Sequence, residues 1–151
     1  MNKSSSGAST DGIHIYPLRV YYEDTDAAGI VYYANYLKYA ERARTELLRD
    51  LGTENARLME TEGLAFAVRR CEVDFFKPAR LDDLLSVETR LIDVGGASLV
   101  ADQRVKRDNA ELVRMELKLA CMSLDGRPAR LPAAVKSRLE EFRVNVHSKK
   151  Q

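Results

Sequence analysis

Cysteine and histidine are scarce in this sequence of 151 residues, which holds two of each. Cys71 and Cys121 lie far apart in segments of strand-like composition, whereas a secreted disulfide scaffold carries several cysteines at regular spacing. We therefore expect free thiols in a reducing compartment and a cytoplasmic location. His14 and His147 lie near opposite ends of the chain, so no zinc-type cluster is formed and no metal is expected.

Long apolar runs and an excess of charge of one sign are also missing. No segment approaches the ~18 apolar residues of a membrane span, and the Ser-, Gly- and Thr-rich residues 1–11 lack the apolar core of a signal peptide. The 24 Lys and Arg nearly cancel the 23 Asp and Glu. This balance provides no global basic field for nucleic acid or an anionic membrane, so any anionic ligand must be held locally.

What is present is the composition of one folded domain. Hydrophobic residues make up 45% and charged residues 31% of the chain, which is long enough to bury a core without metals or disulfides. We expect a flexible tail over residues 1–12, a single domain over residues 13–142 and a frayed tail over residues 143–151.

One amphipathic helix is predicted in the first half of the chain. Apolar side chains recur at helical spacing from Tyr36 to Leu51, and charged side chains cover the opposite face. Asn35 is expected to cap the start of this helix and Gly52 its end. Residues 54–62 are compatible with a second, shorter helix.

The remaining periodicity is that of strands. Five segments qualify: residues 13–22, 65–76, 84–93, 98–107 and 112–124. Turn signals at Gly95-Gly96, Asp108-Asn109 and Asp125-Gly126 suit antiparallel hairpins. In the last segment apolar and polar residues alternate, so one face of the sheet is apolar and needs a cover. We predict an α+β fold, a five-stranded antiparallel sheet wrapped around one long helix.

Three carboxylates, Glu23, Asp24 and Asp26, lie close together between the first strand and the helix. A hydrolytic site needs a carboxylate that attacks an electrophile or removes a proton from water. The helix start near Tyr33 offers unpaired N–H groups and the positive end of the helix dipole to a developing oxyanion. Gly29 lets the backbone turn so that acid and helix start face each other.

Other interpretations of this acidic loop exist. Acidic residues before a helix are common as caps and turn formers, and spacing alone does not separate that role from catalysis. A calcium-binding loop is excluded, because counting from Asp24 two ligand positions fall on Ala28 and Asn35.

Three segments carry a resemblance to a known family. Residues 21–46, YYEDTDAAGIVYYANYLKYAERARTE, resemble the signature of the 4-hydroxybenzoyl-CoA thioesterase family, and within it the YbgC-like branch of Tol-Pal-associated acyl-CoA thioesterases. Weaker matches are residues 73–89, VDFFKPARLDDLLSVET, and residues 121–132, CMSLDGRPARLP. The resemblance covers about residues 13–142.

The resemblance implies a hot-dog fold, a homodimer or homotetramer, and an acyl-CoA or acyl-carrier-protein substrate bound at the subunit interface. The family's catalytic Asp falls on Asp26, as nucleophile or general base, and the residue whose backbone N–H polarises the thioester carbonyl falls on Tyr33. No cofactor is implied, because coenzyme A is part of the substrate. Two departures stand out: the YbgC-like branch usually has His at the position of Tyr33, and Gly95-Gly96-Ala97 replaces a basic, phosphate-gripping turn.

Further residues are candidates for contacts with the substrate. They are Gly29, Val31, Tyr32 and Phe66 for the acyl part, and Arg69, Lys77 and Arg80 for the phosphates of coenzyme A. Charges on strands are often simply solvated, and aromatic residues on strands are often core. The same ambiguity applies to Arg70, Arg104, Lys106, Arg107, Phe75 and Phe76.

The leading hypothesis is an acyl-CoA thioesterase that releases a free acid and a thiol. A dehydratase of the same fold needs a His paired with a carboxylate, and no His lies near the loop. A non-catalytic acyl-CoA-binding module stays as the alternative. The sequence does not indicate the length or polarity of the acyl chain.

An obligate oligomer is also expected. Strict alternation places Cys71, Val73 and Phe75 on the face of the second strand opposite Phe66 and Val68. No second long helix is predicted to cover that outer face, so another subunit is expected to cover it.

Overall fold

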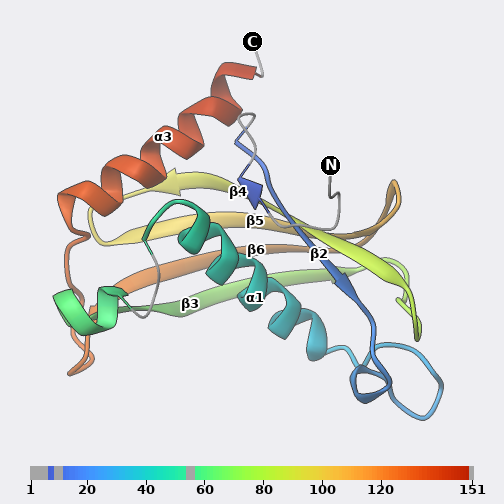
Figure 1. Cartoon of the computed structure of the whole chain (residues 1–151). Helices are drawn as coiled ribbons and strands as arrows, with labels where there is room; N and C mark the ends of the chain where they lie inside the picture. Colours follow the sequence, from blue (N-terminus) through green and yellow to red (C-terminus); the bar gives the residue numbers. More distant parts are fainter. Residues whose placement is uncertain (1–6, 9–11, 54–56, 150–151) are drawn as a thin grey trace.

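The computed structural model describes residues 7–8, 12–53 and 57–149, with the backbone alone for residues 7–8 and 144–149. One antiparallel sheet has the strand order β1-β2-β4-β5-β6-β3. The strands are β1 (Gly7–Ala8), β2 (His14–Arg19), β3 (Leu64–Phe75), β4 (Leu84–Val94), β5 (Ser98–Arg107) and β6 (Ala110–Ser123). Figure 1 shows α1 (Asn35–Asp50) lying across one face of the sheet and α3 (Ala133–Lys149) beside one end of it.

The predicted α+β architecture, with five antiparallel strands around one long helix, is confirmed by β2 to β6 and α1. The two residues of β1 lie within the range that was expected to be a tail. The shorter helix expected over residues 54–62 is represented by η2 (Leu58–Glu62), a turn of π-helix, while residues 54–56 fall outside the described part of the chain. No helix in the described ranges is long and apolar enough to cross a membrane.

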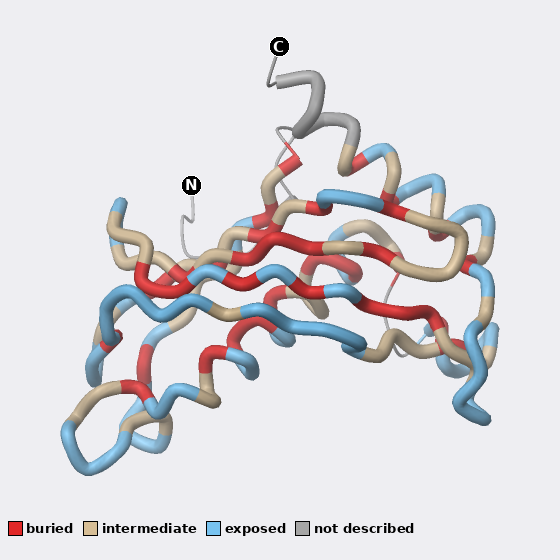
Figure 2. Tube along the Cα trace, turned by 180° about the vertical axis from the view of Figure 1, so that it is seen from behind, coloured by how far each residue is buried: buried red, intermediate tan, exposed pale blue. Residues whose placement is uncertain are grey.

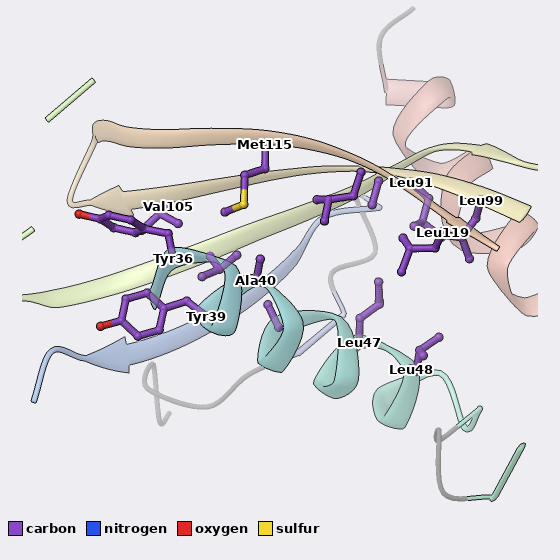
Figure 3. Packing of buried hydrophobic residues seen from close by; sticks show 14 of the residues in the cluster. Tyr36, Tyr39, Ala40, Leu47, Leu48, Leu91, Leu99, Val105, Met115 and Leu119 are labelled. Atoms are coloured by element: carbon purple, nitrogen blue, oxygen red, sulfur yellow. The ribbon is translucent and has the colours of Figure 1, made fainter. Parts of the chain in front are cut away.

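The apolar face of α1 forms the centre of the core. Its buried residues are Tyr36, Tyr39, Ala40, Ala43, Leu47 and Leu48. Figure 3 shows Tyr36 and Ala40 on the side of the helix that faces Val105 and Met115 of the sheet. The helix ends as predicted at Gly52, whose φ of +76° is a left-handed conformation that glycine adopts without steric cost.

The expected cap at Asn35 is wrong. The N-cap is Ala34, which has no side-chain oxygen to accept a hydrogen bond, and Asn35 is the first residue of the helix. The Asn35 amide Nδ2 instead donates to the carbonyl oxygen of Asp24 at 2.8 Å. The side chain therefore ties the acidic loop to the helix, and the first N–H groups of the helix receive no side-chain cap.

The two faces of the sheet differ in chemistry. Along β6 from Leu112 to Leu119 the apolar residues are buried and the charged ones exposed, and Figure 2 shows this alternation on the trace. On the outer face charges pair across and along strands, for example Lys106 of β5 with Glu88 of β4 at 3.2 Å, and Arg104 with Asp102 along β5 at 3.0 Å. These pairs explain Arg104 and Lys106 as surface charges that neighbouring acids neutralise.

β3 contains a β-bulge that overturns one expectation. Val68 pairs with Leu119 and Cys71 with Leu117, so three steps along β3 oppose two along β6. The extra residue shifts the alternation and returns the following apolar residues to the helix side of the sheet. That side carries Phe66, Val68, Cys71, Val73 and Phe75. The prediction that the last three face outward is therefore wrong.

The expectation of no second long helix is also wrong. α3 covers residues 133–149, including most of the range expected to be a frayed tail. Val135, Leu139 and Phe142 are buried in the same core as α1, and Arg138 Nη1 donates to the carbonyl oxygen of Gly52 at 2.9 Å. α3 thus packs on the helix side of the sheet, and no described helix covers the charged outer face.

Candidate active site

The acidic loop is a small hairpin closed by backbone hydrogen bonds. Thr25 and Val31 form a bridge, the Asp26 N–H donates to Ile30 O at 2.9 Å, and the Gly29 N–H donates to Asp26 O at 3.0 Å. Gly29 closes the turn with a φ of +78°, which a residue with a Cβ rarely adopts. Asp26 therefore has a fixed backbone position at the base of this turn.

Two of the loop acids, Asp24 and Asp26, differ in what they bind. Asp24 Oδ2 accepts the Tyr21 N–H at 2.8 Å, and Asp24 lies near Tyr39, whose pKa is raised by burial and then by this carboxylate. Asp26 is exposed and its Oδ1 accepts the Ala28 N–H at 2.9 Å. Within the described residues no donor contacts Asp26 Oδ2. Of these two, Asp24 is bound into the structure, whereas Asp26 presents a carboxylate oxygen to the solvent.

Two backbone donors are unused at the start of α1. The Tyr32 N–H donates to Asp24 O at 3.0 Å, and the Asn35 N–H donates to Tyr32 O at 2.8 Å. Between them, the N–H groups of Tyr33 and Ala34 have no acceptor in the described part of the chain. Donors at a helix N-terminus without a cap suit an oxyanion.

A buried alanine fixes the loop against the helix. Val31 N–H donates to Ala79 O at 2.8 Å, and Ala79 N–H donates to the Tyr36 hydroxyl at 2.9 Å. Burial raises the pKa of Tyr36, so its hydroxyl stays protonated. Ala79, which lies between β3 and β4, thus bonds both to the acidic loop and to α1. The Asp26 backbone and the unused N–H groups at the helix start are therefore held in a fixed relative position.

Aromatic rings surround the helix start. The rings of Tyr32 and Tyr33 are 4.9 Å apart between centroids, and Tyr33 meets Phe75 of β3 edge-on at 6.2 Å. A hydrogen bond with Tyr33 raises the pKa of Tyr32. The Tyr33 side chain is 62% exposed and Phe75 is 52% exposed. Phe75, which had the features of a core residue in the sequence, is brought to this site by the bulge in β3.

The predicted acyl-binding residues do not all gather at the loop. Gly29 and Tyr32 belong to it, whereas the Val31 side chain is 4% exposed and packs in the core. Phe66 lies at the opposite end of β3, in the wall of a cavity beside the second half of α1. Their contacts with a substrate stay predictions.

The predicted phosphate-binding residues fall into two places. Arg80 is exposed and bridges to Ile30 of the loop, with Lys77 nearby in sequence. Arg69 sits at the bulge, eight residues before Lys77, or about 26 Å along an extended strand. The three therefore do not form one cluster within a single chain.

Asp83 organises the segment that follows Arg80. Burial tends to raise the pKa of Asp83, but the Arg80 N–H and the Arg107 guanidinium, which donates at 2.7 Å, hold it below its usual range. Arg107 is thereby accounted for as the partner of this carboxylate. Across the described residues, no group of three or more His, Cys, Asp and Glu side chains could hold a metal ion.

A cation that sequence reading did not find lies at the Gly95-Gly96 turn. Leu131 N–H donates to Gly96 O at 2.8 Å, and the Arg130 guanidinium is so close that a Cβ on Gly96 would lie 3.3 Å from its Nη2. The turn has no basic residue of its own. The loop before α3 supplies one instead, and such a contact between distant segments leaves no signal in the local sequence.

Comparison with known proteins adds independent findings. A family model described as the thioesterase-like superfamily matches residues 20–139. The acyl-CoA thioesterase YbgC of Haemophilus influenzae is 46% identical over 123 residues, 81% of this chain and 90% of the relative. The acyl-CoA thioester hydrolase YbgC of Escherichia coli O6:H1 is 45% identical over 80% of this chain and 90% of the relative. The crystal structure of a probable thioesterase from Bartonella henselae, 40% identical, has a TM-score of 0.77 and covers 80% of this chain and 99% of that one.

Proposed function

This chain belongs to the thioesterase-like superfamily and is a thioester hydrolase, and on that premise we propose that it hydrolyses acyl-CoA with Asp26 as the catalytic carboxylate. The observation that supports this role is the position of Asp26, one short hairpin before two unused backbone N–H groups at the start of α1. Asp24 is a weaker candidate because it is less exposed than Asp26, and its carboxylate accepts the Tyr21 N–H and lies near the buried Tyr39.

Hydrolysis adds water across the bond between the acyl carbon and sulfur. Asp26 either attacks the carbonyl carbon, giving an anhydride that water opens, or removes a proton from the water that attacks. In both routes negative charge develops on the carbonyl oxygen and the thiolate leaves and takes up a proton. The Tyr33 N–H is the donor that stabilises this oxygen, helped by the positive end of the α1 dipole.

The two routes for Asp26 leave different traces. In a single turnover in water enriched in heavy oxygen, label in the Asp26 side chain indicates the anhydride route. Label in the released acid alone is expected for the general-base route, and failure to trap an acyl-enzyme anhydride on Asp26 distinguishes that route from an anhydride that water opens at its acyl carbon.

The phosphates of coenzyme A are assigned to Lys77 and Arg80. Arg80 is exposed and bridges to Ile30 of the loop, and Lys77 precedes it on the same connection.

The functional unit is a homodimer formed through β3. β3 is 12 residues long and ends the sheet, so one of its edges has no partner strand in the described chain. Beside it Leu37, Val68 and Phe75 are 45%, 48% and 52% exposed. An edge strand of this length with exposed apolar side chains on one face favours pairing with a second copy. Light scattering is expected to give about twice 17.0 kDa, or a multiple of that dimer.

Release of free thiol from a panel of acyl-CoA substrates tests the proposed function. Turnover that disappears in Asp26→Asn supports it. Binding of acyl-CoA without any release of thiol would instead identify a non-catalytic acyl-CoA-binding module.

A further inference from the structure

Asn35 is the first residue of α1, but its side chain does not cap the helix. Its amide Nδ2 donates to the carbonyl oxygen of Asp24, eleven positions earlier, at 2.8 Å. Figure 1 shows the loop that carries Asp24, between β2 and the start of α1. Because a carbonyl oxygen only accepts hydrogen bonds, the amide must turn its nitrogen toward Asp24. The side chain therefore uses its donor to bind the acidic loop.

The carbonyl oxygen of Asp24 also accepts the Tyr32 N–H, at 3.0 Å. A carbonyl oxygen has two lone pairs, so both acceptor positions of this oxygen are in use. The Asn35 N–H donates in turn to the Tyr32 carbonyl oxygen at 2.8 Å. These hydrogen bonds form a closed ring through Asp24, Tyr32 and Asn35.

The ring includes the peptide unit that carries the proposed oxyanion donor. The Tyr32 C=O and the Tyr33 N–H belong to one planar trans peptide, in which the two groups point in opposite directions. Because the Asn35 N–H holds the Tyr32 oxygen, the direction of the Tyr33 N–H is set as well. The preceding peptide unit is held by the bond from the Tyr32 N–H to Asp24. The orientation of the donor therefore depends on the ring that the Asn35 side chain closes.

The same ring holds the arm of the hairpin that carries Asp26. Asp24 lies two residues before Asp26 on this arm, and Thr25 between them bridges to Val31 on the other arm. A shift of the Asp24 carbonyl therefore moves Asp26 relative to the helix start. Tyr39, one turn further along α1, lies near the Asp24 carboxylate. The loop thus keeps a second support when the Asn35 amide is removed.

We propose that Asn35 is a positioning residue for thioester hydrolysis, and that its side-chain amide sets the angle between the Asp26 carboxylate and the Tyr33 N–H. This inference rests on the proposed function, which assigns those two groups to catalysis. Asn35 acts through Asp24 and Tyr32, and in the described part of the chain it makes no hydrogen bond to either catalytic group. A misplacement of about 1 Å is enough to lower a rate roughly 10²-fold.

A purely stabilising role for Asn35 would have a different effect. At the other end of α1, Thr53 Oγ1 also donates to a backbone carbonyl, that of Leu48, at 3.2 Å. Such a bond contributes to stability wherever it lies in the fold. If Asn35 only stabilised the fold, its removal would act like the removal of the Thr53 bond. Stability would decrease, and kcat per folded molecule would stay the same.

The test measures kcat, KM and the denaturant midpoint of the full chain, with the acyl-CoA that wild type cleaves fastest. Asn35→Ala is expected to lower kcat about tenfold or more and to change KM less than about threefold, because the catalytic groups move while the substrate contacts stay. Thr53→Val is the matched control, with a similar decrease in midpoint and the kcat of wild type. Asn35→Leu is the second variant, because Leu branches like Asn, has no donor and favours helix, so it serves if Asn35→Ala does not fold.

A double-mutant cycle with Asp26→Asn separates positioning from a loss of folded protein. In the Asp26→Asn protein, Asn35→Ala should lower kcat less than about twofold, because no carboxylate is left to misplace. The same factor in both backgrounds would overturn the inference. So would a kcat within about threefold of wild type in folded Asn35→Ala or Asn35→Leu.

The proposed function has its own outcome in this experiment. Thiol release by wild type that is lost in Asp26→Asn supports the function, whatever the Asn35 variants do. Absence of thiol release from every acyl-CoA would refute the function, and the positioning role of Asn35 with it.

Discussion

The two ends of α1 are built in opposite ways. At the C-terminal end Thr53 N–H and Thr53 Oγ1 both donate to Leu48 O, at 2.7 and 3.2 Å, and Gly52 O accepts from Arg138. At the N-terminal end the cap is Ala34, and the N–H groups of Tyr33 and Ala34 have no acceptor in the described chain. The C-terminal end of α1 thus has its polar groups hydrogen-bonded, whereas the N-terminal end leaves two N–H groups without an acceptor. We therefore expect the C-terminal end to contribute to stability and the N-terminal end to catalysis.

The largest expected effect comes from removing the acid near the N-terminal end of α1. Asp26→Asn should lower kcat by about 10²-fold or more, the range for losing a nucleophile or general base. The melting temperature should stay the same, because Asp26 is exposed and Asn can still accept the Ala28 N–H. Near-wild-type turnover by a folded Asp26→Asn protein would reject the assignment.

Removing one backbone N–H tests the N-terminal end of α1 without changing the charge of any side chain. Tyr33→Pro removes the proposed oxyanion donor and should lower kcat by about 10²-fold. Ala34→Pro is the matched control, since Ala34 has a φ of −68° that proline adopts readily, and its N–H is also unused. Circular dichroism checks that both fold. Equal losses in the two variants would mean that Ala34 shares the role.

At the C-terminal end of α1 a substitution should affect stability alone. Thr53→Val removes the hydrogen bond from Thr53 Oγ1 to Leu48 O in a buried position and should cost about 1 kcal/mol of unfolding free energy. Denaturant titration measures this loss, and kcat should be unchanged. A drop in kcat with no loss of stability would contradict the assignment of a purely stabilising role to the C-terminal end of α1.

The contact between His14 and the C-terminal end of α1 should make the stability of the fold depend on pH. His14 is fully buried and its Nε2 lies 2.9 Å from Asp50 Oδ2; burial lowers its pKa, against the opposing effect of Asp50. The unfolded chain then binds more protons, so stability is complete above pH ~6.5 and decreases as the pH falls below it. The melting temperature should decrease between pH 7 and 5 more steeply in wild type than in His14→Gln. Parallel curves would show that His14 is not responsible.

The smallest expected effect is at the phenol of Tyr33. Tyr33→Phe keeps the backbone N–H and the edge-on contact with Phe75, so kcat should change less than about threefold. Thiol release under saturating substrate measures it. A loss as deep as that of Asp26→Asn would show that the hydroxyl transfers a proton.

The sequence predicted those parts of the fold that periodicity encodes. The apolar stripe from Tyr36 to Leu48 and the alternation along β6 identified the helix and the sheet that it covers. The bulge in β3 was missed because one extra residue shifts the alternation without changing any residue type. α3 was missed because three buried residues in residues 133–142, among charged neighbours, give only a weak helical pattern.

For the site, the sequence predicted the segment but not the separate roles within it. Asp24 and Asp26 are chemically the same, and they are distinguished by their exposure and by their different hydrogen-bond donors, the Tyr21 N–H for Asp24 and the Ala28 N–H for Asp26. The unused N–H groups of Tyr33 and Ala34 depend on backbone geometry. The contact of Arg130 with Gly96 joins distant segments.

The bulge in β3 adds one residue to the strand and thereby changes which residues of the sequence face α1. Side chains alternate with a period of two, so one residue more or less exchanges the two faces of everything that follows. Arg69 is the residue without a partner in β6, so its deletion would leave a regular ladder in which Cys71 and Phe75 keep their partners Leu117 and Val113. A descendant of this sequence could therefore lose the bulge through a single deletion and still present Phe75 to Tyr33.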